Sequence, residues 1–255
     1  MLVPVLERRA HVALTPSPSK RRLRWVGDNT EVRFVRFPVA VLAVIWGMSC
    51  GARANADVPP VGAKAQAAGL VDVRSVVPDS VIELRYATPN NFTGAPLYPA
   101  DARCLVHESM ASGLATAADI LRRQGQSLVF WDCYRPHDVQ VRMFHVVPNP
   151  AWVARPGQYA HSHESGRSVD VTLASGHCQQ RGRRCLVDMG TDFDDFTPRA
   201  YAFASQGVSA DALANRARLR DVMSAGGLTV YSGEWWHFDG PGASVDRPIL
   251  DVPVD

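Results

Sequence analysis

The chain has 255 residues, with 27 Lys and Arg against 25 Asp and Glu, which gives a formal net charge of +2. The positive charge is concentrated at the N-terminus, because residues 1–56 carry nine basic and three acidic side chains whereas residues 57–255 carry 18 and 22. The main part of the chain is therefore mildly acidic and has no basic stripe, which argues against binding to nucleic acid.

Residues 1–56 have the pattern of a secretory signal peptide with a basic N-terminal extension. An arginine-rich stretch precedes an apolar run of 13 residues, 37–49, and an Ala-x-Ala site ends at Ala56. The run is shorter than the roughly 20 residues of a membrane helix, so we expect cleavage after Ala56 and a periplasmic protein without stable membrane insertion. An uncleaved anchor helix is the alternative. Cys50 lacks the upstream aliphatic residue typical of lipoproteins, so we expect no lipid anchor there.

We expect the segment 57–70 to be a flexible tether, because the stretch from Pro59-Pro60 through Ala68 is of low complexity, and one domain should follow over 71–255. Partial alternation over 81–86 predicts a strand, and the turn-forming residues of 90–96 predict a loop. Apolar residues then recur at helical spacing from Met110 to Leu121, and Gly125 should end this helix.

A short buried strand over 127–131 leads to Pro136, which should open a second helix, since proline is favoured at a first helical position. A third helix is marked by Leu213, Ala217 and Met223 and closed by a Gly-Gly pair. The remaining strands are expected over 169–173, 229–231 and 236–238. This order predicts an α+β domain with a mostly antiparallel sheet flanked by helices.

Four cysteines follow the expected cleavage site, and an even number in an exported chain favours disulfides. Cys178 and Cys185 flank a polar turn and are expected to pair. Cys104 and Cys133 would then form the second bridge.

Two short segments, 162–170 and 233–237, carry the residues with the clearest chemistry. Catalytic zinc typically takes three protein ligands and leaves its fourth position to water. The histidines His163 and His237 with Asp170 suit this role, because they leave the ion a positive charge that acidifies the water. Glu234 could then take the proton as a general base. The combination predicts a zinc hydrolase; for His163 and Asp170 alone, a core histidine and a surface aspartate are the alternative.

Two further features bear on this site. Glu234 and His237 are three residues apart and would face opposite sides of a regular strand, so the backbone must bend or bulge if both serve one metal. Arg135 stands at a strand-to-helix junction, where it can stabilise an oxyanion. A structural ion pair with Asp132 is the alternative. Because Cys133 lies two residues before Arg135, its disulfide should also steady this arginine.

The motifs together resemble the D-alanyl-D-alanine dipeptidases, the zinc enzymes known from vancomycin resistance and their relatives in Gram-negative bacteria. The resemblance runs from about Val71 to Val254 in the family's order. Its elements are Ser-His-x-x-Gly-x-x-x-Asp at 162–170, Glu-Trp-Trp-His at 234–237, Tyr-Arg-Pro at 134–136, and the segment from Tyr86 to Gly94 that contains Asn-Phe-Thr-Gly.

The resemblance implies the compact α+β fold shared with other D,D-peptidases and the hedgehog signalling domain. It implies one zinc ion on His163, Asp170 and His237, Glu234 as general base, and Arg135 stabilising the transition state.

Three further residues are implied to contact the substrate. Asp194 matches a position that binds the free ammonium of the substrate, and Tyr86 matches a residue that lines the pocket. His161 stands where the family usually has a serine that helps hold the N-terminus of the dipeptide. It is therefore a candidate substrate-binding residue, with a surface position as the alternative.

We therefore expect zinc-dependent hydrolysis of D-alanyl-D-alanine, or a similar D,D-dipeptide, to free D-amino acids. A D,D-carboxypeptidase acting on peptidoglycan stem peptides would use the same ligand set and is the nearest alternative. A non-catalytic zinc-stabilised binding domain would need neither Glu234 nor Arg135, and a wall-binding protein without metal would not need the His/Asp set.

Overall fold

The computed structural model describes residues 58–180 and 183–255, with the backbone alone at 177–180 and 183–184. The expected signal peptide and Cys50 lie outside the described residues, so export and cleavage stay predictions. Within the described ranges, none of the helices is long and apolar enough to cross a membrane.

The centre of the fold is a six-stranded sheet in which β2, β4, β5, β8 and β7 lie side by side and β6 pairs with β5. Only the β2–β4 pair is parallel, so the expectation of a mostly antiparallel sheet is confirmed. A separate two-stranded sheet is formed by β1 and β3. The strands are β1 Leu70–Asp72, β2 Val81–Ile82, β3 Leu105–His107, β4 Gln126–Asp132, β5 Ser168–Gln180, β6 Arg183–Leu186, β7 Thr229–Val230 and β8 His237–Asp239.

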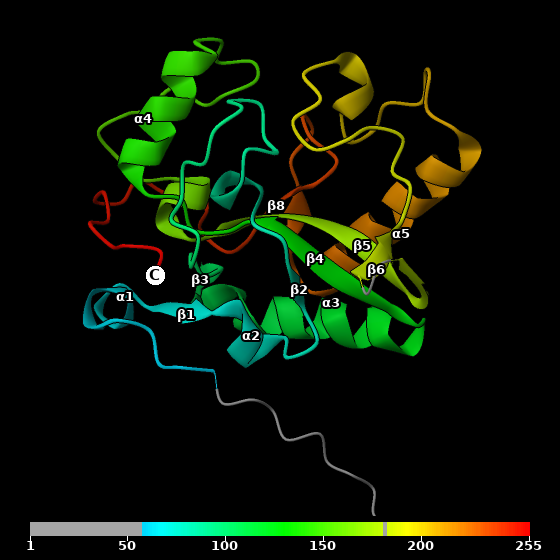
Figure 1. The fold of residues 1–255 in the computed structure, drawn as a ribbon, viewed down its shortest axis with the longest axis horizontal. Helices are drawn as coiled ribbons and strands as arrows, with labels where there is room; N and C mark the ends of the chain where they lie inside the picture. The colour runs from blue at the N-terminus through cyan, green and yellow to red at the C-terminus, as the bar shows by residue number, and fades with distance from the viewer. Residues whose placement is uncertain (1–57, 181–182) are drawn as a thin grey trace, which may run out of the picture. The chain divides into compact units, whose positions relative to one another are not determined.

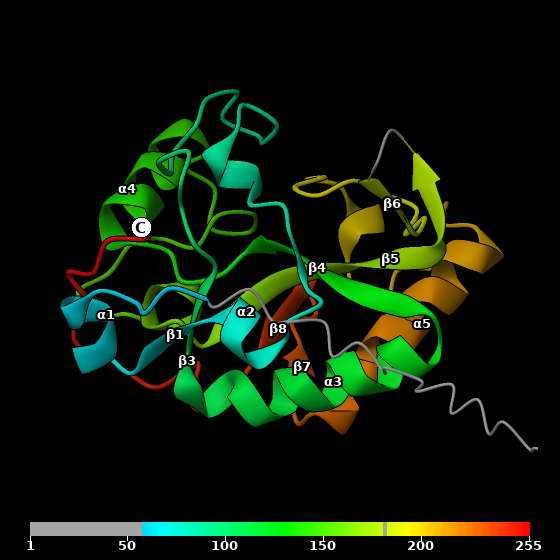
Figure 2. The ribbon, with the colours of Figure 1, turned by 60° about the horizontal axis from the view of Figure 1, so that its bottom comes forward.

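Helices flank the central sheet, as the sequence predicts. Figures 1 and 2 show α3 and α5 together on one face of the sheet, whereas α4 lies on the opposite side. Short 3-10 turns connect several strands, and two of them, 85–87 and 162–165, carry residues of the site described below. The helices are α1 Ala63–Ala67, α2 Val73–Val76, α3 Ala111–Arg123, α4 His137–Val146 and α5 Ala210–Ala225.

The α3 helix buries the apolar face that its sequence period predicts. Leu114, Ala117 and Leu121 are fully buried, and Gly125 follows the helix in the left-handed conformation, with φ of +70°. These side chains pack in the same core as the buried residues of β4 and β5. Burying each such Leu side chain contributes about 1.5–3 kcal/mol, so α3 is held to the sheet chiefly by this face.

The structure differs from the sequence-based expectations in three places. Part of the segment expected to be a flexible tether forms α1, in which Ala65 is buried. The strand expected over 81–86 ends at Ile82, because the chain turns in a 3-10 turn that buries Tyr86. In α5 the expected apolar positions Leu213 and Ala217 are only half-buried, and the buried face is centred on Arg216 instead.

The Cys104–Cys133 disulfide is confirmed, with a Cα–Cα distance of 5.2 Å. Cys185 is also disulfide-bonded, but the side chain of its expected partner, Cys178, lies outside the described part of the structure. That pairing stays a prediction.

Where α3 meets the C-terminal end of α5, the two backbones touch through glycines. A Cβ atom on Gly113 would lie 2.3 Å from the carbonyl oxygen of Gly226, a distance that real Cβ atoms do not reach. We expect Gly113→Ala to lower the free energy of unfolding by about 1–3 kcal/mol, the usual cost of overpacking, in urea titration. Gly157→Ala is the control, since its nearest neighbour would be at 4.0 Å. Equal stability of the two variants would contradict this account of the helix contact.

Candidate metal and substrate site

Three buried side chains from separate parts of the chain converge on one point. Nε2 of His163 lies 3.1 Å from Nδ1 of His237 and 3.2 Å from Oδ1 of Asp170. Nδ1 of His237 lies 3.0 Å from the same oxygen. Among the residues that the structure describes, this is the one group of at least three His, Cys, Asp or Glu side chains that could hold a metal ion.

The sheet register and one glycine bring these residues together. Asp170 on β5 is directly opposite His237 on β8 and Asp132 on β4, so three polar residues form a row across three strands. His163 lies in the 3-10 turn before β5. The chain reverses at Gly166, which has φ of +67° and where a Cβ atom would lie 2.5 Å from the Leu70 side chain. Only glycine fits both requirements.

The outer nitrogen of each imidazole is held by a hydrogen-bond acceptor. Nδ1 of His163 donates to the carbonyl oxygen of Cys133 at 2.7 Å, and Nε2 of His237 donates to Oδ1 of Asp239 at 3.0 Å. Metal-binding histidines usually have such partners, which set the tautomer and orient the ring. Asp239 is not among the residues that the sequence analysis singled out. Its position two residues after His237 in a strand, hence on the same face, could have indicated it.

With the outer nitrogens protonated, the inner nitrogens of the neutral rings and Oδ1 of Asp170 all present lone pairs to one another at 3.0–3.2 Å. Such an arrangement needs a proton or a cation between the atoms. Burial disfavours the anion of Asp170, but the two histidines outweigh it and hold the pKa of Asp170 well below its usual value. Burial also opposes the charged form of His237, yet Asp170 and Asp239 raise the pKa of His237 to about 10. The donor set therefore fits a divalent transition metal.

Glu234 lies in the turn between β7 and β8, so it need not share a strand face with His237, from which it is three residues away. The turn spans the residues between Val230 and His237, so Glu234 is outside the strand and its Oε2 lies 3.9 Å from Nδ1 of His237. Burial raises the pKa of Glu234 to about 7, against the attraction of His237 and with added repulsion from Asp170. The carboxyl group therefore lies beside the cluster of His163, Asp170 and His237 but is not one of its three close donor groups.

Arg135 both forms the ion pair with Asp132 and faces the cluster. Its Nε and Nη2 donate to Oδ2 of Asp132 at 2.9 and 2.6 Å, and its Nη1 donates to Gln140 at 2.7 Å. Nη2 lies 3.9 Å from Oδ2 of Asp170. Burial opposes the charged guanidinium, but Asp132 keeps the pKa of Arg135 well above its usual value. Arg135 is thus a buried cation with a fixed orientation.

Asp194 and Tyr86 form a second polar pair at the site. The phenol of Tyr86 donates to both carboxylate oxygens of Asp194, at 3.0 and 3.2 Å. Burial raises the pKa of Asp194 well above its usual value, and repulsion from Asp170 and Glu234 raises it further. Asp194 also has φ of +56°, a conformation that a non-glycine residue adopts at a cost and that is common at functional sites.

A buried arginine organises the loop that carries Asp194. Nε of Arg216 donates to the carbonyl of Met189 at 2.7 Å, and its Nη1 donates to the carbonyl of Arg199 at 2.8 Å. The guanidinium also lies over the ring of Trp235, 5.5 Å from its centroid. The sequence analysis did not identify Arg216, because its position on α5 resembles an ordinary exposed arginine and its acceptors are backbone groups distant in sequence.

All eight residues predicted for metal, catalytic or substrate roles line one cavity of about 710 Å³. His161 lies on its wall, but its ring is exposed and Nε2 is 2.6 Å from Oδ1 of Asp246. An aromatic group that the sequence analysis left unassigned completes another part of the wall. Within this group the indole of Trp152 stacks on Phe196, and Phe196 contacts Phe92. The predicted residues are Tyr86, Arg135, His161, His163, Asp170, Asp194, Glu234 and His237.

Comparison with known proteins shows that the chain is similar to peptidases of one family. The sequence model of the Peptidase_M15 family, described as D-ala-D-ala dipeptidase, matches residues 66–255. A D-alanyl-D-alanine dipeptidase of Escherichia coli is 35% identical over 181 residues, covering 71% of this chain and 89% of that protein. A D-alanyl-D-alanine dipeptidase of Enterococcus faecium is 32% identical, covering 68% and 91%, and one of Streptomyces coelicolor is 30% identical, with the same coverage.

The cluster of His163, Asp170 and His237 yields a metal-binding prediction. We expect the purified protein to contain one divalent metal ion per chain, and His163→Ala or His237→Ala to lose most of it in elemental analysis, because each removes one of three donors. His161→Ala is the control, since this histidine lies two residues from His163 but outside the cluster. Full metal retention in both cluster variants would exclude the site.

The contact between Asp239 and His237 yields a second prediction. We expect Asp239→Asn to bind the metal about 10–100-fold more weakly, the usual effect of changing an outer partner of a ligand. The dissociation constant can be measured by competition with a chromogenic chelator. Asp246→Asn provides the comparison, because Asp246 is exposed and its carboxylate contacts the exposed His161, which is not part of the cluster. Equal affinity of Asp239→Asn and the unmodified protein would show that this carboxylate has no part in metal binding.

Proposed function

Because the chain belongs to the D-ala-D-ala dipeptidase family of peptidases, we propose that it hydrolyses D-alanyl-D-alanine, or a similar D,D-dipeptide, with one bound zinc ion. The observation that carries the proposal is the convergence of the His163–Asp170–His237 cluster, Glu234 and Asp194 on one cavity. Each group has a separate task in cleaving a small zwitterion.

The three residues of the cluster would hold the zinc. When bound, zinc supplies a positive charge that acidifies a water molecule and polarises the peptide carbonyl. Two imidazoles and one carboxylate leave that charge only partly neutralised, and the hydrogen bonds to Cys133 and Asp239 fix the two rings.

Glu234 is the general base in this proposal. Its carboxylate lies beside the cluster, where it accepts a proton from the attacking water and then donates it to the amine that leaves. Arg135 lines the same cavity, and its guanidinium would stabilise the carbonyl oxygen as it becomes negative. Because Asp132 and Gln140 already orient this cation, little reorganisation is needed as that charge develops.

Asp194 with Tyr86 is the ammonium site in this proposal. Three carboxylates, Asp170, Asp194 and Glu234, border the cavity; burial raises the pKa of Asp194, and repulsion from the other two carboxylates raises it further. A bound ammonium group relieves that repulsion and favours the ionised form. A substrate with a free N-terminus is therefore preferred over an acylated one, which distinguishes a dipeptidase from a carboxypeptidase acting on longer peptides.

The role of Glu234 can be tested by Glu234→Gln, which keeps the shape of the side chain but removes its basicity. We expect metal content to be retained and kcat for D-alanyl-D-alanine to fall by about 10²–10⁴-fold or more. Glu108→Gln, at an exposed position distant in sequence from the turn, should retain full activity. Normal turnover of Glu234→Gln with metal bound would assign the base to another group.

The role of Asp194 can be tested by Asp194→Asn, with Asp192→Asn on the same loop as control. Removing one partner of a buried charge pair costs about 3–5 kcal/mol, so we expect KM for D-alanyl-D-alanine to rise strongly and the preference over N-acetyl-D-alanyl-D-alanine to narrow. Asp192 is exposed and should have little effect. If the unmodified protein cleaves both compounds equally fast, the dipeptidase proposal fails in favour of a carboxypeptidase.

A further inference from the structure

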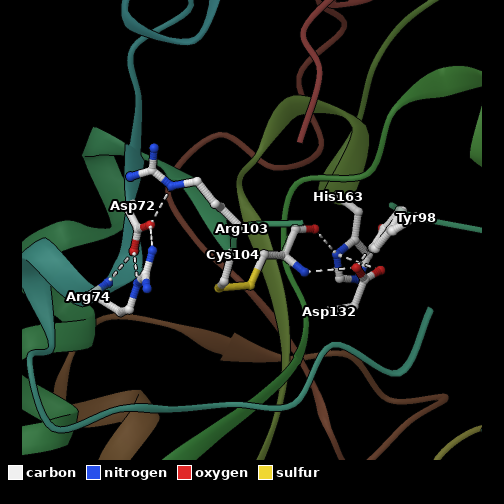
Figure 3. The surroundings of a disulfide bond; sticks show 8 residues. Asp72, Arg74, Tyr98, Arg103, Cys104, Asp132 and His163 are labelled. Atoms are coloured by element: carbon white, nitrogen blue, oxygen red, sulfur yellow. Dashed lines mark hydrogen bonds and ion pairs between the residues drawn. A yellow bond between two sulfur atoms is a disulfide. The ribbon is translucent and has the colours of Figure 1, made fainter. Parts of the chain in front are cut away.

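The Cys104–Cys133 disulfide is connected to the His163–Asp170–His237 cluster by one hydrogen bond, between the Cys133 carbonyl and His163 (Figure 3). We propose that this bridge is a positioning element for the metal ligand His163, so that its loss weakens metal binding beyond any effect on stability. The inference rests on the proposed function, because it assumes that the cluster binds zinc.

The first step is the contact between Cys133 and His163. The Cys133 carbonyl accepts from Nδ1 of His163 at 2.7 Å, and a carbonyl can only accept, so this bond sets the tautomer of the ring. Nε2 is rigidly connected to Nδ1 through the ring. The place of Nε2 in the cluster therefore depends on where the Cys133 carbonyl is held.

The second step is that the same turn holds His163 at two points. The backbone N–H of Arg135 donates to the carbonyl of His163 at 3.1 Å, two residues after Cys133. Within the turn, the N–H of Cys133 donates to Oδ1 of Asp132, and Oδ2 of Asp132 binds the guanidinium of Arg135. A shift of residues 132–135 would therefore move the metal ligand and the cavity arginine together.

The third step is that the disulfide ties this turn to a different sheet. β4 ends at Asp132, so Cys133 lies just beyond the sheet ladder, whereas Cys104 directly precedes β3 in the β1–β3 sheet. The carbonyl of Cys104 accepts from the N–H of Val73. The adjacent Arg103 binds the Asp72 carboxylate, and Figure 3 shows this ion pair. Next to the bridge, the N–H of Tyr134 donates to the carbonyl of Leu105 at 2.8 Å.

Both cysteines are buried, so the bridge is suited to a permanent support rather than to exchange with solvent thiols. Without it, the turn would keep the Tyr134–Leu105 hydrogen bond but lose its covalent tie to the β1–β3 sheet. The double variant Cys104→Ala/Cys133→Ala should therefore have a looser His163 and an otherwise similar cavity.

The experiment compares zinc affinity in the full chain, measured by chelator competition well below the unfolding temperature. We expect the double variant to bind zinc at least 10-fold more weakly, in the range for lost outer partners of metal ligands. The visible spectrum of the Co²⁺-substituted protein should change as well, because it reports the ligand geometry.

Two controls separate positioning from general instability. Leu121→Ala removes a buried side chain of α3 and should lower the unfolding temperature without changing zinc affinity or the Co²⁺ spectrum. Cys178→Ala/Cys185→Ala removes the cysteine pair predicted at the β5–β6 turn and should also keep zinc affinity. Unchanged affinity and spectrum in Cys104→Ala/Cys133→Ala would overturn the inference alone, whereas absence of zinc binding by the unmodified protein would overturn the proposed function.

Discussion

The buried carboxylate of Asp132 is the contact on which the geometry of the site depends. It accepts four hydrogen bonds: Oδ1 accepts from the phenol of Tyr98 and the N–H of Cys133, and Oδ2 accepts twice from Arg135. A fully buried charge is tolerated only when paired and hydrogen-bonded in this way. Satisfying Asp132 therefore also fixes the direction of the arginine and the turn whose carbonyl holds His163.

Charge balance explains why the other polar groups lie where they do. Asp170, Asp194 and Glu234 border one cavity with Arg135 as the buried cation near them. The excess of carboxylates is unfavourable in a poorly solvated site, and it is relieved by cations. A divalent metal at the cluster and a substrate ammonium at Asp194 would supply these charges at two different points. Under the proposed function, the arrangement would favour a small zwitterionic ligand over a neutral or anionic one.

Several elements were predictable because their signals are local. The helix around Leu114 and Leu121 follows a clear period and is followed by Gly125, and the strand over 127–131 contains the continuous apolar run 128–131. In the α5 helix the buried position of Met223 was predicted correctly, but Leu213 and Ala217 are only half-buried, because a period of apolar residues cannot indicate that Arg216 is buried. Its burial depends on backbone carbonyls of the loop 189–201, which lie beside it only in the folded chain.

The sequence by itself determined the candidate chemistry: the His163, Asp170 and His237 set, the adjacent Glu234, the Arg135 position and the family to which these motifs belong. Residue types and short spacings are sufficient for that. Only the tertiary structure decided how these groups meet, through the register of β4, β5 and β8 and the reversal at Gly166. It also showed the contacts of Asp239 and Cys133 to the two imidazoles. The hydrogen bond to the Cys133 carbonyl leaves no pattern in the sequence, and the i, i+2 spacing of His237 and Asp239 indicates a shared strand face but not the hydrogen bond itself.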